Sequence, residues 1–262
     1  MAKLVLDLTK GIEENASVYF EKAKRIKKKI EGAEIALNES VKKLQELELK
    51  KEKIIRKESK EREFKDRKKE WYEKFRWFIS SEGFLVVGGR DATSNEVVIK
   101  KHTEANDLVF HTDMAGSPFF VVKSEGREIR EKTKQEAADA TCTFSRAWKL
   151  GLHTTSVFCV SPEQVSKKTK AGEYMGKGAF MIYGTTNYID NEINLAVGMT
   201  KNSQIMAGPA DAVKKNCREF VVLIQGSEKP SDTAKYIQRK IGGLIDDIVR
   251  ALPSGTFKVK KD

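Results

Sequence analysis

WYEKFRWFISSEGFLVVGGRDATSNE, residues 71–96, marks the point at which the character of this chain changes. Before it the sequence is highly charged with a helical period, and after it short apolar runs alternate with glycines. Trp71, Phe75 and Phe78 are spaced by four and three residues, which predicts an aromatic face on the last turns of a helix. Residues 84–87, FLVV, predict a buried strand that ends in a glycine pair. A helical region is therefore expected to meet a sheet here.

The glycine pair and its surroundings resemble the start of the RNA-binding domain of the NFACT family, the RqcH/NEMF-type factors of ribosome-associated quality control. In that family the pattern W-F-x-S-x-G-F-L-V-x-G-G-[RK]-D-A-x-x-N-E recurs. Three later segments are similar to the same domain in the same order: residues 107–123 (DLVFHTDMAGSPFFVVK), 144–148 (FSRAW) and 162–184 (PEQVSKKTKAGEYMGKGAFMIYG). The resemblance covers most of the chain and implies an RNA-binding domain preceded by an elongated coiled coil.

Charge is concentrated towards the N-terminus, where residues 1–70 contain 21 Lys and Arg against 15 Asp and Glu. The whole chain carries a net charge of +11, which favours an anionic partner and fits nucleic acid better than a membrane surface. No run of 18 apolar residues and no signal-peptide pattern is present in the sequence. We therefore expect a cytoplasmic protein that does not bind membranes.

The three cysteines, Cys142, Cys159 and Cys217, are widely separated and form no C-x-x-C pair. An odd number without histidines at ligand spacing disfavours a disulfide framework and a zinc site. We expect reduced, mostly buried thiols, and no cofactor.

The N-terminal region is predicted to form a coiled-coil arm over residues 1–76. Apolar positions alternate steps of four and three, as in a heptad seam: Ile12, Ala16, Tyr19, Ala23, Ile26, Ile30, Ala33 and Leu37. Because such a seam needs a partner, we expect the chain to turn back between residues 38 and 62 into an antiparallel, intramolecular hairpin. A homodimeric coiled coil would satisfy the same seam, and one helix running on to Trp71 is the third arrangement.

Residues 77–262 are predicted to form the globular domain. Short apolar runs bounded by turn residues predict strands at 107–111, 118–122, 157–160, 179–183, 193–197, 204–207 and 220–224. Helices are expected over residues 133–150 and about 232–252. The predicted fold class is α+β: N-terminal coiled-coil helices followed by a mixed or mainly antiparallel sheet with packed helices.

Catalytic groups are few. His111, Asp113 and Ser117 surround a single turn, whereas hydrolytic triads are usually assembled from separated segments, and no G-x-S-x-G elbow is present. The family often has a second histidine where this chain has Pro118. The lysine-rich segment also lacks the Ser or Thr that follows the lysine of an NTP-binding loop. We expect a protein that is not an enzyme.

Residues 161–178 combine lysines, glycines and a tyrosine, which suit phosphate and base contacts. A flexible solvated loop is the alternative interpretation. We expect this segment and the turn at Arg90 to lie on one basic surface. The predicted nucleic-acid-binding residues are Arg90, Lys100, Lys101, His111, Arg146, Lys149, Lys167, Lys168, Lys170, Tyr174 and Lys177.

The resemblance implies a module that binds RNA and ribosomes, with the large ribosomal subunit and tRNA or rRNA as partners. Factors of this family engage obstructed large subunits that carry peptidyl-tRNA. The family's N-terminal domain has no counterpart in this sequence, so activities that depend on it are not carried over. The alternative functions are a coiled-coil protein-interaction or fibronectin-binding-like adhesion module and, third, an enzyme acting on RNA.

Overall fold

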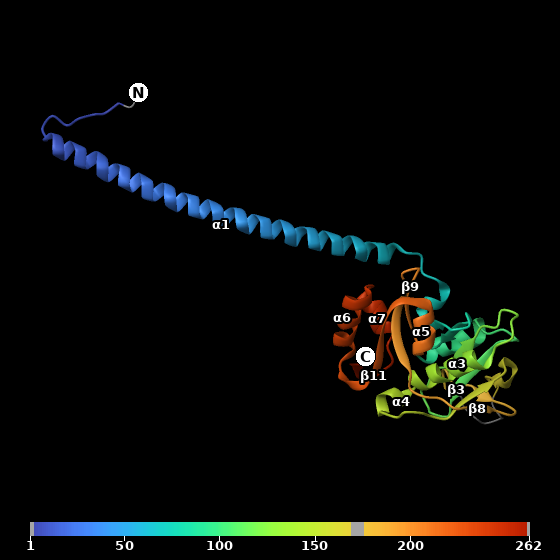
Figure 1. The fold of residues 1–262 in the computed structure, drawn as a ribbon. Coiled ribbons are helices and arrows are strands. Elements are labelled where there is room, and N and C mark those ends of the chain that lie inside the picture. Colours follow the sequence, from blue (N-terminus) through green and yellow to red (C-terminus); the bar gives the residue numbers. More distant parts are fainter. Residues whose placement is uncertain (1–2, 169–175, 261–262) are drawn as a thin grey trace. The chain divides into compact units, whose positions relative to one another are not determined.

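The computed structural model describes residues 3–168 and 176–260. The chain divides into two units, Met1–Glu63 and Phe64–Asp262. The first unit is built on helix α1 (Ile12–Asp66), which follows a short segment without regular secondary structure (Figure 1). The division lies earlier than the boundary expected at residue 76, so Trp71 and its neighbours belong to the globular unit.

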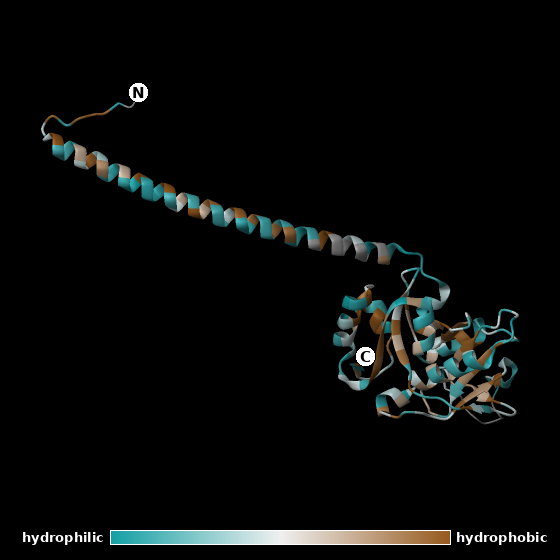
Figure 2. Ribbon diagram, in the orientation of Figure 1, coloured by the Kyte–Doolittle hydropathy of each residue, from teal (hydrophilic) through white to brown (hydrophobic). Residues whose placement is uncertain are grey.

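Helix α1 shows that the expected hairpin is wrong, because it continues without interruption through residues 38–62. This span contains no Gly or Pro and is rich in Lys, Glu and Leu, which are strong helix formers, so no residue in it favours a turn. The predicted seam is exposed: Ile26 is 49% exposed and Leu37 is 64% exposed. Hydrophobic and hydrophilic residues are interspersed along the coloured part of the helix (Figure 2). The homodimeric coiled coil stays a prediction.

The aromatic segment after α1 is also different from its prediction. Residues Trp71–Lys74 form a short 3-10 helix, η1, and the chain then enters strand β1 (Arg76–Ile79). Strand β1 pairs with β2 (Leu85–Gly88), and this pairing buries Trp77 and Phe78. Aromatic residues suit strands as well as helices, and the partner strand decides between the two.

The core of the globular unit is a six-stranded sheet with the order β1-β2-β4-β3-β5-β8. Every described pair of neighbouring strands in it is antiparallel. The four remaining strands are β3 (Leu108–Thr112), β4 (Phe120–Val122), β5 (Val157–Val160) and β8 (Asn187–Ile189). The prediction of a mainly antiparallel α+β fold is confirmed.

Helices cover both faces of this sheet. On one face α3 (Glu131–Thr143) packs across β3, β4 and β5, above Phe110 and Val122. On the other face α2 (Ala92–Lys101) packs against Val87, Val109 and Val121. Successive side chains of a strand point to opposite faces, so runs such as Phe-Val-Val supply two cores at once.

A second, four-stranded sheet completes the unit. Its antiparallel strands follow the order β10-β9-β11-β12: β10 (Ile205–Gly208), β9 (Leu195–Thr200), β11 (Cys217–Glu228) and β12 (Phe257–Val259). It is accompanied by α5 (Ala210–Asn216), α6 (Pro230–Ile241) and α7 (Ile245–Ala251) (Figure 1). The predicted last helix is therefore split into α6 and α7, because Gly242 and Gly243 adopt positive φ between them.

Smaller elements connect the sheets. A five-residue helix, α4 (Arg146–Leu150), follows α3, and η2 (Pro162–Gln164) leads to the two-stranded pair β6 (Val165–Ser166) and β7 (Met181–Ile182). Ser145 caps α4, and this cap divides the single helix predicted over residues 133–150. Gly151 ends α4 in the left-handed conformation.

The three cysteines are free and buried, as expected. Burial raises the pKa of the Cys142 and Cys217 thiols to about 12 and that of Cys159 to about 11, so all three remain protonated at neutral pH. Within the residues that the structure describes, no helix is both long and apolar enough to cross a lipid bilayer.

Candidate nucleic-acid interface

The glycine pair after β2 is required by close packing. A Cβ atom at Gly88 would overlap the ring of Phe120, and one at Gly89 would overlap the side-chain amide of Asn95. Only glycine fits at these two positions, because the Cβ atom of any other residue would clash with a neighbouring side chain. The turn that follows brings Arg90 to the start of α2.

Helix α2 is held in place by its first turn. Asp91 caps it, because its carboxylate accepts the backbone N–H of Ser94 at 2.7 Å. Asn95 accepts the backbone N–H of Phe119 at 3.1 Å and donates to the carbonyl of Ser117 at 3.3 Å. The N-terminal end of α2 is thus fixed to the turn between β3 and β4.

A depression of about 380 Å³, which we call the basic depression, opens beside this turn. It lies between the start of α2, the β3–β4 turn, helix α4 and residues 177–180. Its lining includes five cations and one carboxylate: Arg76, Arg90, Arg146, Lys149, Lys177 and Asp91. A concave surface with this excess of positive charge attracts an anionic ligand.

Five of the predicted site residues line the basic depression: Arg90, His111, Arg146, Lys149 and Lys177. They come from four separate segments of the chain, so the structure brings together positions that the sequence could only name one by one. Arg146 and Lys149 are exposed on α4, and Lys177 is exposed as well. The Arg90 turn and the end of the lysine-rich segment thus share one concave surface.

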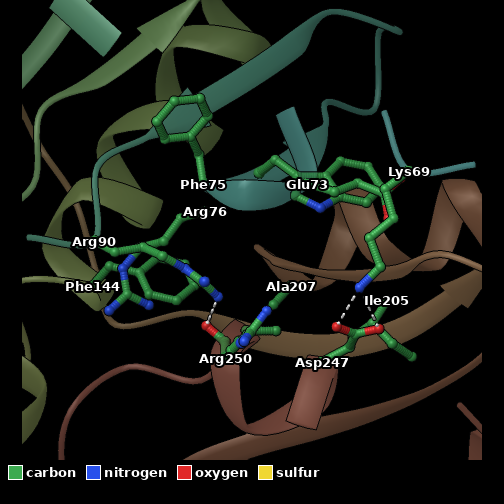
Figure 3. A pocket seen from close by; sticks show the side chains of 12 residues that line it. Lys69, Glu73, Phe75, Arg76, Arg90, Phe144, Ile205, Ala207, Asp247 and Arg250 are labelled. Atoms are coloured by element: carbon green, nitrogen blue, oxygen red, sulfur yellow. Dashed lines mark hydrogen bonds and ion pairs between the residues drawn. The ribbon is translucent and has the colours of Figure 1, made fainter. Parts of the chain in front are cut away.

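Arg76 and Arg90 form the inner side of the depression. Figure 3 shows their guanidinium groups next to the ring of Phe144, where the Cζ atom of Arg76 lies 4.6 Å from the ring centroid. Arg76 donates to the carbonyl of Leu252 at 3.0 Å, and Arg90 donates to the carbonyl of Arg250. Both arginines therefore satisfy the C-terminal end of α7, where helix geometry favours cations.

The two guanidinium groups also affect each other. Burial, together with the nearby charge of Arg90, lowers the pKa of Arg76 to about 9. The Nε atom of Arg90 is buried and has no hydrogen-bond partner in the described structure. Both side chains remain charged at neutral pH, and neither forms an ion pair with a described carboxylate, so both can pair with an anion.

His111 forms part of the aromatic side of the depression. Its ring stacks on Phe119 with a centroid distance of 3.8 Å and contacts Phe158 edge-on. Its Nδ1 atom lies 3.0 Å from the carbonyl of Pro118, which can only accept, so Nδ1 carries the hydrogen. Burial lowers the pKa of His111, and the neutral ring therefore presents Nε2 as a hydrogen-bond acceptor at pH 7.

The other predicted residues do not line the depression. Lys167 pairs with Glu96 at 2.6 Å and lies over the ring of Phe180. Lys100 and Lys101 lie in the last turn of α2, at the opposite end from the depression, and Lys168 is exposed elsewhere. Lys170 and Tyr174 lie outside the described residues.

Sequence reasoning missed Arg76 and Phe144. The signal for Arg76 was present, because a cation inside the aromatic run FRWF has no apolar reason to be there. Phe144 gave no separate signal, because its helical spacing is that of an ordinary residue of the hydrophobic core. No group of three or more potential metal ligands occurs within residues 3–168 and 176–260.

Comparison with known proteins agrees with the resemblance inferred from the sequence. Residues 74–184 match the family described as NFACT protein RNA binding domain. The archaeal Rqc2 homolog aRqcH of Methanocaldococcus jannaschii is 40% identical over 202 residues, which cover 74% of this chain and 30% of that protein. The NEMF homolog of Drosophila melanogaster, a ribosome quality control complex subunit, is 34% identical over 200 residues, covering 74% of this chain and 19% of its own.

Human NEMF, also a ribosome quality control complex subunit, is 36% identical over 180 residues, which cover 67% of this chain and 16% of that protein. The chain thus spans less than a third of the length of each of these curated relatives. The matches confirm the NFACT resemblance.

Proposed function

Because this chain carries an NFACT-type RNA-binding domain, we propose that it is the non-catalytic RNA-binding module of a ribosome-associated quality control factor. Its partners are the large ribosomal subunit, obstructed by peptidyl-tRNA, and tRNA or rRNA. The observation that carries this proposal is the basic depression, whose lining contains five cations from four separate segments and one carboxylate.

Phosphate recognition follows from the chemistry of this lining. Arg76 and Arg90 are preorganised by carbonyls of α7 and retain N–H groups for a ligand, and arginine binds phosphate oxygens with two parallel hydrogen bonds. Arg146 and Lys149 extend the positive charge along α4. Such contacts position a nucleic acid backbone without reading its sequence.

The experiment compares the parent with a variant that carries Arg146→Ala, Lys149→Ala and Lys177→Ala. Affinity for tRNA is measured at several salt concentrations. Each lost phosphate contact lowers the slope of log affinity against log salt by about 0.7–0.9, so we expect a decrease of roughly two units for the triple variant. The matched control carries Lys214→Ala, Lys215→Ala and Lys240→Ala, three exposed lysines outside the depression.

Equal salt slopes for the parent and both variants would show that the depression does not bind phosphate. A further variant, Lys100→Ala with Lys101→Ala and Lys168→Ala, tests whether the RNA footprint extends to the predicted residues away from it. Cosedimentation with obstructed and with vacant large subunits tests the ribosomal partner. We expect retention on obstructed subunits by the parent and a loss in the depression variant.

The exposed seam of α1 supports a second candidate function, protein contact through a coiled coil. Ile26, Ile30 and Leu37 are all more than 45% exposed, and an apolar seam of this length is stabilised when it packs against another helix. Sedimentation equilibrium of the chain tests this point. A mass that stays monomeric at all concentrations would exclude the homodimeric coiled coil, and binding of a fibronectin-type ligand without RNA would favour the adhesion alternative.

A further inference from the structure

We propose that the basic depression holds a single nucleotide that has left the base-paired stack of an RNA. In this arrangement the phosphate lies among the cations and the base lies against the aromatic side formed by His111, Phe119 and Phe180. This inference rests on the proposed RNA-binding function and specifies which part of the RNA the same site takes.

The size of the depression points to one monomer. Its volume of about 380 Å³ lies near the lower end of the range of ~300–1,000 Å³ typical of small-ligand sites. A paired helix keeps its bases stacked inside and would present only its backbone to such a hollow. An unpaired nucleotide at a bulge or loop can swing out and enter it.

The cations are arranged so that several of them can contact one phosphate group. Arg90 is held at the inner side by its bond to Arg250, while Arg146 and Lys149 are exposed on α4 and Lys177 comes from the segment before β7. The one carboxylate of the lining, Asp91, is exposed, and its Oδ1 atom already accepts the hydrogen bonds from Ser94 that cap α2.

Polar groups other than the cations are mostly occupied within the protein. Asn95 bonds to Phe119 and Ser117, Ser117 donates to Met114, and Ser145 donates to Cys142. Among the lining groups whose contacts are described, Nε2 of His111 stands out as a neutral acceptor left to a ligand. Every nucleobase carries N–H donors on its Watson–Crick edge, and the ribose 2′-OH is a donor as well.

The aromatic side supplies the remaining contact. His111 and Phe119 stack with nearly parallel rings at an interplanar angle of 6°, and Phe180 meets Phe119 edge-on at 5.3 Å. Phe180 is partly exposed in this lining. Aromatic side chains stabilise unstacked bases with little preference for sequence, which suits a site that selects an unpaired base rather than a particular base.

The test compares two hairpin RNAs of equal length and charge, one fully paired and one with a single bulged 2-aminopurine. Fluorescence anisotropy gives the affinities, and 2-aminopurine emission reports the environment of the bulged base. We expect the parent to bind the bulged hairpin about tenfold more tightly than the paired one, a preference in the lower part of the range for one base–aromatic contact. Binding should also change the emission of the 2-aminopurine.

Two variants separate the base site from the phosphate contacts. Ala115→Trp fills the depression from the β3–β4 turn, so it should abolish the preference for the bulge and leave the two hairpins with equal affinities. Its matched control is Ala105→Trp, at an exposed position outside the depression, which should keep the preference. His111→Phe keeps the ring stack, removes the acceptor and should reduce the preference in part. Thermal unfolding of each variant verifies that it is folded.

The outcomes distinguish this inference from the proposed function. If the parent binds both hairpins equally, and the Arg146, Lys149 and Lys177 variant weakens both, the nucleotide site is wrong and phosphate binding stands. If Ala115→Trp leaves the preference unchanged, the bulge is recognised elsewhere and the site is again wrong. If the parent binds neither hairpin, both proposals fail.

Discussion

At the scale of single residues, the turn after β2 shows that one residue, Gly89, can decide the geometry of the site. Gly89 leaves room for the amide of Asn95, Asn95 fixes the β3–β4 turn, and this turn carries Ser117 and Phe119 into the depression. Asp91 and Ser94 exchange hydrogen bonds at the start of α2. The position of Arg90 thus depends on the packing and the hydrogen bonds of its neighbours.

Gly89→Ala should destabilise the globular unit by about 1–3 kcal/mol, because the new methyl group forces Asn95 away from its two backbone partners. The free energy of unfolding in urea measures this loss. Gly176→Ala is the control, since a Cβ there meets no atom within 4 Å and the residue has no positive φ. Equal stability of the two variants would show that the turn adapts without cost.

Glu136 on α3 is a second decisive residue. It is 2% exposed, its Oε2 atom accepts the N–H of Ser81 at 2.8 Å, and its Oε1 atom has no partner in the described structure. Burial raises the pKa of this carboxyl above its ordinary value. A raised pKa in the folded state means that the fold is stabilised as the pH falls towards that pKa and loses this stability as the pH rises through it.

Glu136→Gln should therefore stabilise the protein at pH 7, by roughly 1 kcal/mol, because it removes a buried charge and keeps an acceptor for Ser81. The advantage should shrink as the pH is lowered from 7 to 5, because the raised pKa lets the parent carboxyl take up its proton at a higher pH than an ordinary glutamate does. Denaturant unfolding at both pH values checks this. An advantage of the same size at both values would contradict the assignment of Glu136 as the titrating group.

At the scale of elements, Lys167 and Lys177 belong to the same lysine-rich segment but have different surroundings. Lys167 joins β6 to α2 through the Oε1 atom of Glu96, and the same oxygen accepts the N–H of Gly178 at 3.2 Å. The hydrogen bond from Lys167, followed by that from Gly178, lowers the pKa of Glu96 to about 2. Lys177 instead points its charge to the depression. One lysine thus holds the segment in place and the other remains available to a ligand.

Lys167→Ala should increase amide hydrogen exchange around Gly178 severalfold while the salt slope of RNA binding falls by less than Lys177→Ala lowers it. The physical reason is that Lys167 is already neutralised by Glu96 and releases few counterions when RNA binds. Hydrogen-exchange mass spectrometry and salt titrations of the two single variants test the contrast. A larger effect of Lys167→Ala on the salt slope would reverse the assignment.

At the scale of the whole molecule, the chain consists of two units with different sources of stability. The globular unit encloses buried clusters on both faces of its six-stranded sheet and reaches from Phe64 to Asp262. Helix α1 exposes large apolar residues, and its described side chains form no comparable core. Cooperative unfolding is therefore expected from the globular unit alone.

A fragment of residues 64–262 should unfold within about 3 °C of the full chain and retain the RNA affinity of the basic depression. All residues that line the depression and both hydrophobic clusters lie in this fragment. Differential scanning calorimetry and tRNA titrations of the fragment and the full chain provide the measurement. A large loss of stability in the fragment would show that residues 1–63 contribute to the core.

The sequence by itself determined the class of the protein. Its charge, the ordered motifs around Gly88 and Gly89, and the apolar runs of the strands predicted an α+β domain of NFACT type behind a helical arm, because these signals are local and survive without knowledge of contacts. It also named five of the residues that line the depression. The glycine pair was informative because only glycine fits where backbone and side chains pass so closely.

Only the tertiary structure decided which cations act together. Lys167 and Lys177 are equivalent in sequence, but Glu96 engages the first while the second lines the depression. Arg76 stands out in the sequence as a cation in an aromatic run, but only the fold brings it to the carbonyl of Leu252, after α7, and beside Arg90. Strand pairing likewise overrode the helical spacing at Phe78. These outcomes depend on contacts between residues distant in the chain, and local periodicity carries no information about such contacts.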